Sequence, residues 1–74
     1  MRKRQEEFVR NYPIKSRRFV IGMTLHQLSG LTGIDIDELR LIDNGKIKPR
    51  NMTAKNLLAI ADALGVDPHI LVEG

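Results

Sequence analysis

The sequence predicts an all-α fold, a compact bundle of about five short helices. Apolar residues recur at three- and four-residue spacing in several short stretches, and no stretch alternates convincingly with a period of two. Glycines, prolines and residues typical of helix caps separate these stretches. The 74 residues make one small domain with a marginal core, because a chain of this length buries only about 60% of its unfolded surface.

The clearest pattern lies in residues 23–46, where two short amphipathic helices are expected on either side of a tight turn at Gly33. Leu25, Leu28 and Leu31 recur at helical spacing in the first of them, together with Thr32. Two short helices joined by a glycine-containing turn make a helix-turn-helix unit. The remaining helices are expected to support this unit.

The second helix of the unit is expected at residues 34–43. Ile36, Leu39 and Ile42 form its apolar stripe, and Leu41 lies beside that stripe. A helix with one apolar face packs that face on its neighbours and leaves the other side for solvent or a partner.

Capping residues indicate where both helices begin and end. Thr24 with Gln27, and Asp35 with Glu38, match the capping-box pattern of a side chain at the N-cap and a second one three residues later. Residues 44–45, Asn-Gly, are expected to stop the second helix, with Asn44 suited to the left-handed conformation at a helix end.

Two further helices are predicted before this unit. Residues 2–10 could form a short basic helix with Glu6 and Arg10 paired four positions apart. Pro13 ends it and opens a helix over residues 13–21. We therefore divide the chain into a basic extension, residues 1–12, and a helix-turn-helix domain, residues 13–74.

Two more helices are predicted after the unit. Thr53 is expected to cap a helix that Gly65 closes, and Pro68 to open a last apolar turn. The expected buried stripe of the longer helix is Leu57, Leu58, Ala61 and Leu64, flanked by Ile60, and the last turn carries Ile70, Leu71 and Val72.

Charge is segregated along the chain. Twelve Lys and Arg against nine Asp and Glu give a net charge of +3 and a pI near 9.7. Basic residues gather before the unit and again at residues 46–50, whereas acids gather at residues 35–43. Such a balance permits nucleic-acid binding without requiring it.

Residues 22–46 and 56–71 resemble the Cro/lambda-repressor-like helix-turn-helix domains (XRE-type) of small phage and bacterial regulators. The resemblance extends over roughly residues 13–73 and implies double-stranded DNA as partner, with the second helix of the unit in the major groove. It also implies an ion pair between Arg18 and Asp43 that stabilises the fold, and a possible homodimer. It implies phosphate contacts at Asn44 and Lys46, and the basic flanks add Lys48, Arg50 and N-terminal arginines such as Arg17 as further candidates for phosphate contacts.

The side chains expected on the outer face of residues 34–43 suit two different partners. The set is Ile36, Asp37, Glu38, Arg40 and Leu41. Ile36 and Leu41 carry no hydrogen-bonding group for a base edge, and Asp37 would face a polyanion. One hypothesis is a DNA-binding regulator held by its basic flanks. The alternative is an anti-repressor that binds another, basic helix-turn-helix repressor through this acidic and apolar face.

Other function classes find little support in the sequence. There is no cysteine, and His26 and His69 lack metal-ligand spacing, so we expect no enzyme, metal or cofactor. No apolar run approaches the roughly 20 residues that span a bilayer, and no apolar segment follows the basic N-terminus as in a signal peptide. We therefore expect a cytoplasmic protein with no membrane partner.

Overall fold

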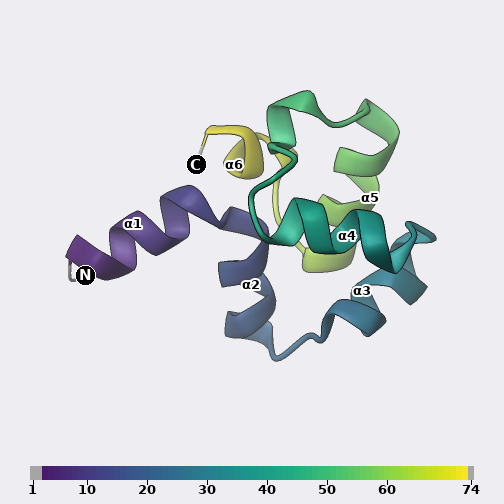
Figure 1. The fold of residues 1–74 in the computed structure, drawn as a ribbon, viewed down its shortest axis with the longest axis horizontal. Helices are drawn as coiled ribbons and strands as arrows, with labels where there is room; N and C mark the ends of the chain where they lie inside the picture. The colour runs from purple at the N-terminus through teal and green to yellow at the C-terminus, as the bar shows by residue number, and fades with distance from the viewer. Residues whose placement is uncertain (1–2, 74) are drawn as a thin grey trace.

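The computed structural model describes residues 3–73, with side chains for residues 6–72, and confirms the all-α prediction (Figure 1). No strand occurs between residues 3 and 73. The ends of the predicted domains, residues 1–2 and 74, lie outside the described residues. In chain order the elements are α1 (Lys3–Asn11), α2 (Pro13–Ile21), α3 (Leu25–Thr32), α4 (Ile36–Asp43), the 3₁₀ helix η1 (Pro49–Asn51), α5 (Ala54–Leu64) and α6 (Pro68–Glu73).

The hydrophobic core takes side chains from each of the α-helices α2 to α6 and from the turn between α3 and α4. Helix α3 packs against both α4 and α5, and α5 packs against α6. Burial of these side chains is the main favourable term in a chain this small. The buried residues are Ile14, Leu28, Ile34, Leu39, Ile42, Ile60, Ala61, Leu64 and Leu71.

Helix α1 packs against α2 and extends away from the remaining helices (Figure 1). The contact is aromatic: the ring of Phe8 lies 5.5 Å from that of Tyr12 and 6.2 Å from that of Phe19, measured between centroids. Among residues 6–72 no ion pair joins Glu6 to Arg10, although the sequence predicts one. Packing on α2 therefore holds this short helix in place of the expected charge pair.

Helix α3, the first helix of the helix-turn-helix unit, begins and ends as the sequence predicts. The Thr24 hydroxyl accepts a hydrogen bond from the Gln27 backbone, and the Gln27 side chain accepts one from the Thr24 backbone, so this capping box is confirmed. Gly33 has a φ of 75°, a left-handed conformation in which glycine avoids the penalty of a Cβ atom.

The end caps of α4 differ from the prediction. Asp35 accepts from the Asp37 backbone, but Glu38 does not complete a box, because its side chain accepts from the Asn56 amide across the gap to α5. The left-handed residue after α4 is Gly45, with a φ of 77°, whereas Asn44 has a φ of −90°. The prediction for Asn44 was wrong since the adjacent glycine adopts this conformation with less strain.

The predicted stripe of α5 was wrong at one position, since Ala61 and Leu64 are buried as predicted but Ile60 takes the place expected for Leu58. Ile60 is completely buried, whereas Leu58 is 55% exposed. Positions 57, 60, 61 and 64 share one face at 3.6 residues per turn, and residue 58 lies about 100° from residue 57. The tertiary contact with α3 selects this face, a choice that a run of neighbouring apolar residues leaves open.

Candidate nucleic-acid interface

The outer side of α4 carries the exposed part of the predicted interface. Leu39 and Ile42 point into the core and fix the rotation of the helix. Asp37 and Arg40 then face solvent, with side chains 80% and 54% exposed, and Leu41 is 47% exposed. Ile36 is half-buried, so the apolar part of this face is smaller than the sequence suggests.

Arg18 of α2 and Asp43 of α4 form a bidentate ion pair inside the protein. The Arg18 Nη2 atom lies 2.7 Å from Asp43 Oδ2, and Nε lies 3.0 Å from Oδ1. Nη1 donates to the backbone carbonyl of Met23 at 2.9 Å. Asp43 is 5% exposed and Arg18 is 7% exposed, so this pair joins α2 to the end of α4 and is not available to a ligand.

Lys15 joins this group from one turn earlier in α2. Its Nζ donates to Asn44 Oδ1 at 2.6 Å and lies 3.9 Å from Asp43 Oδ2. The amide of Asn44 is thereby held beside the end of α4, with its remaining hydrogen-bonding groups exposed to solvent. Lys15 was not among the predicted site residues, although its spacing of three from Arg18 places both on one face of a helix.

The acids of residues 35–43 all have partners within the fold. Asp37 Oδ1 lies 2.9 Å from Arg40 Nη1, one turn further along α4. Asp35 caps its own helix, and Glu38 accepts from Asn56 at 3.3 Å. With Asp43 paired to Arg18, α4 presents less unbalanced negative charge than its sequence indicates.

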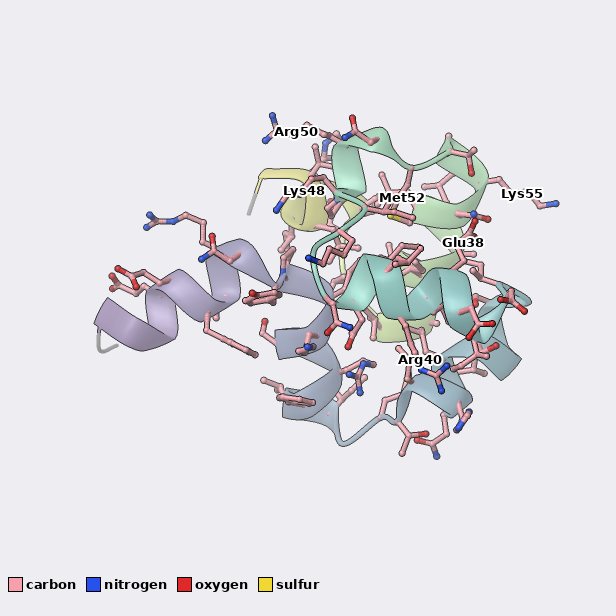
Figure 2. The ribbon with its side chains drawn as sticks, viewed as in Figure 1. Glu38, Arg40, Lys48, Arg50, Met52 and Lys55 are labelled. Carbon is pink, nitrogen blue, oxygen red and sulfur yellow. The ribbon has the colours of Figure 1, made fainter. Side chains whose placement is uncertain are left out.

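The basic side chains after α4 are exposed. Lys46 and Lys48 lie in the loop between α4 and η1, and Arg50 lies within η1. The backbone amides of residues 46 and 47 both donate to the carbonyl of Leu41, which folds this loop back against the end of α4. Figure 2 shows Lys48 and Arg50 near α6, away from Arg40 on α4 and from Lys55 and Glu38 at the opposite end.

Arg17, predicted to contact phosphate, lies elsewhere. It is half-buried on α2, and its Nε donates to the carbonyl of Leu64 at 3.2 Å. Leu64 is the last residue of α5, where free carbonyls are negative and attract a cation. The predicted site residues thus separate into a paired internal group, an α4 face and an exposed basic loop, with Arg17 outside all three.

The described residues contain no group of three side chains suited to hold a metal ion and no helix long and apolar enough to cross a membrane. Residues 21–73 match the family model of the Cro/C1-type HTH DNA-binding domain. No curated protein and no solved structure matches the chain. The matched segment begins at the end of α2 and includes α3 to α6, so α1 and most of α2 precede it.

Proposed function

The chain belongs to the Cro/C1-type helix-turn-helix DNA-binding family, and from this premise we propose that it regulates transcription by binding duplex DNA through the segment that follows α4. In this proposal α4 lies in the major groove and the basic loop holds the adjacent phosphates. Phosphate contacts position such a protein on DNA, and base contacts select the sequence. The proposed phosphate ligands are Asn44, Lys46, Lys48 and Arg50.

The observation that carries this proposal is the continuity of the exposed basic loop with the exposed face of α4. Lys46 lies three residues after the end of α4, and its backbone amide donates to the carbonyl of Leu41 at 2.8 Å. Cations at the end of a groove-binding helix meet the sugar-phosphate backbone as the groove curves away. Each phosphate that is neutralised releases condensed counterions, and this release favours binding.

The internal pairing of the acids also supports a DNA partner. An acidic helix is repelled by phosphates, but Asp43 is buried against Arg18 and Asp37 lies against Arg40. At the distance of a phosphate, the negative charge of each carboxylate is largely cancelled by the positive charge of its arginine. The exposed pair of Asp37 and Arg40 contributes little to the stability of the fold. The carboxylates that argue against DNA in the sequence therefore argue less strongly against it in the fold.

Base selection in this proposal rests on Arg40 and Leu41. Arg40 is the basic side chain of α4. Its Nη1 atom donates to Asp37, and its other N–H groups can donate to guanine O6 and N7 without breaking that pair. Leu41 is apolar and exposed and can contact a thymine methyl group, a role that the half-buried Ile36 is less able to fill. Sequence-dependent DNA shape would supply the rest of the specificity.

The proposed biological role is repression control of a phage or mobile element in the cytoplasm, in keeping with the resemblance stated above. Such regulators read paired half-sites as symmetric dimers. In the last helix Leu71 is a core residue, whereas Ile70 is 59% exposed and is the better candidate for contact with a second copy. Sedimentation of the wild type and of Ile70→Lys tests this part: a dimer that Ile70→Lys dissociates supports it, and a wild-type monomer contradicts it.

The anti-repressor hypothesis keeps one specific support, the exposed Leu41 beside the exposed carboxylate of Asp37. It loses another, because Ile36 is half-buried and offers a partner little apolar surface. The substitution Asp37→Lys separates the two functions. It should strengthen binding to any duplex DNA under our proposal, and it should abolish binding of a basic repressor under the alternative.

The direct test is a titration of labelled duplex DNA with the protein at salt concentrations from about 50 to about 200 mM. We expect binding in the micromolar range or tighter that weakens steeply with salt, and Lys46→Ala should flatten the logarithmic slope by about 0.9. Lys55→Ala, which removes an exposed charge of the same sign outside the loop, serves as control. Absence of DNA binding, together with release of DNA from a repressor, would overturn the proposal in favour of the alternative.

A further inference from the structure

A hollow of about 400 Å³ lies between the end of α1, η1 and the last turns of α6. Arg10 and Asn11 line it from α1, and Lys48 and Arg50 line it from the loop and η1. Leu71 contributes apolar surface from α6. Figure 2 shows Lys48 and Arg50 at this side of the molecule, beside α6. Segments from opposite halves of the chain thus bring three cationic side chains to one concave surface.

Among residues 6–72, no acidic side chain lines this hollow to balance its charge. Among residues 6–72, neither ion pairs nor side-chain hydrogen bonds are formed by Arg10, Lys48 or Arg50, and all three are exposed. Like charges that converge without a counter-charge repel one another, so the arrangement is expected to favour an anion in the hollow.

We infer that this hollow binds a phosphate of the DNA backbone and that Arg10 makes α1 part of the DNA-binding surface. The inference rests on the proposed function and extends it. Lys46, Lys48 and Arg50 form one exposed basic path from the end of α4 to η1, and Arg10 continues that path onto α1. Arginine suits this position since its planar guanidinium binds two phosphate oxygens at once.

Arg10 lies outside the segment that matches the family, residues 21–73. The phosphate contact would therefore be an addition that α1 supplies to a helix-turn-helix domain. The aromatic contact of Phe8 with Tyr12 and Phe19 gives α1 a defined orientation on α2. Through that contact Arg10 is held beside the loop and does not need DNA to order it.

A purely structural role for Arg10 predicts a different experimental result. Basic side chains near the C-terminal end of a helix interact favourably with its dipole, and Arg10 lies in the last turn of α1. If that interaction were the reason for Arg10, its removal would lower the thermal midpoint of unfolding. A phosphate ligand would instead change the salt dependence of DNA binding and leave the midpoint nearly unchanged, because the free protein loses no partner.

The experiment measures DNA binding by the full chain across the same salt range, using a labelled duplex of mixed sequence. Arg10→Ala should reduce the logarithmic salt slope by about 0.9 and weaken binding severalfold and uniformly across sequences. Arg10→Lys should restore most of the slope, because it keeps the charge. Lys55→Ala removes one exposed charge at the opposite end of the molecule and should leave the slope close to that of the wild type (Figure 2).

Two results overturn the inference without touching the proposed function. One is a wild-type salt slope in Arg10→Ala, and the other is an equal change in Arg10→Ala and Lys55→Ala, which would reflect net charge alone. A lower thermal midpoint with an unchanged slope would assign Arg10 the structural role. Failure of the wild type to bind duplex DNA would overturn the proposed function and this inference together.

Discussion

At the scale of single residues, the ion pair between Arg18 and Asp43 has the largest consequence. Both side chains are nearly inaccessible to water, and the carboxylate accepts two hydrogen bonds from one guanidinium. Such a pair gives little net stability compared with an apolar pair, but loss of one partner leaves an uncompensated buried charge. The pair fixes where α4 ends relative to α2, and it therefore positions Asn44 and the basic loop.

The first prediction concerns the loss of one partner of this pair, which costs more stability than the intact pair provides. Arg18→Met should lower the free energy of unfolding by about 3 to 5 kcal/mol, a large part of the roughly 4 to 11 kcal/mol expected for a chain of this length. Urea denaturation followed by circular dichroism measures the change. The double variant R18M/D43L should be less destabilised than R18M alone. A loss below about 1 kcal/mol in R18M would mean that the pair behaves as a surface pair.

At the scale of elements, glycines decide how α3 ends and α4 begins. Gly30 lies inside α3, and Gly33 forms the turn with a φ of 75°. Apart from its chain neighbours and the backbone of its own helix, a Cβ atom added at either position would meet no atom within 4 Å. A methyl side chain therefore fits at both sites, and the two sites differ only in backbone conformation.

The second prediction uses these glycines as a matched pair. Gly30→Ala should raise the free energy of unfolding by about 0.5 to 1 kcal/mol, since alanine favours a helix. Gly33→Ala should lower it by about 1 to 2 kcal/mol, since an L-residue is strained in the left-handed conformation. Thermal denaturation of both variants measures the changes. Equal effects of the two substitutions would contradict the turn conformation described above.

A third prediction concerns the face that α5 buries. Ile60→Ala should cost about 2 to 5 kcal/mol because it opens a cavity in the core. Leu58→Ala, two residues earlier on the exposed side, should cost less than about 1 kcal/mol. Denaturant titration of the two variants compares them directly. If Leu58→Ala lowered the free energy of unfolding more than Ile60→Ala does, the stripe predicted from the sequence would be right, with Leu58 buried and Ile60 at its flank.

At the scale of the whole molecule, α1 stands apart from the other helices. Every α-helix from α2 to α6 contributes to the shared core, whereas the described side chains of α1, residues 6–11, add no buried residue to it and contact α2 through Phe8. A segment with few buried contacts opens more easily than the core does. The proposed division at residues 12 and 13 and the proposed phosphate ligand Arg10 both depend on how firmly α1 is held.

The fourth prediction is a gradient of hydrogen exchange in the free protein. Backbone amides of residues 6–11 should exchange faster than those of α3 and α5, and Phe8→Ala should accelerate exchange in α1 while leaving α5 unchanged. Exchange monitored by mass spectrometry on the full chain tests this. Equal protection in α1 and α5 would place α1 within the same cooperative unit and contradict the division.

The whole chain also separates what local sequence determines from what packing determines. Thr24, Gln27 and Gly33 act on neighbours a few residues away, so helix boundaries and the all-α class followed from the sequence with little error. The family could likewise be identified from residues 22–46 and 56–71, and its model matches residues 21–73.

Only the tertiary structure decided which side chains are available to a partner. A carboxylate at position 38 can cap its own helix or bond to another helix, and the proximity of Asn56 selects the second. Ile60 rather than Leu58 is buried because α3 lies on that side of α5, and Arg17 turns to the end of α5. Local sequence sets the helices through short-range hydrogen bonds, whereas the charge of the surface depends on partners far apart in the chain.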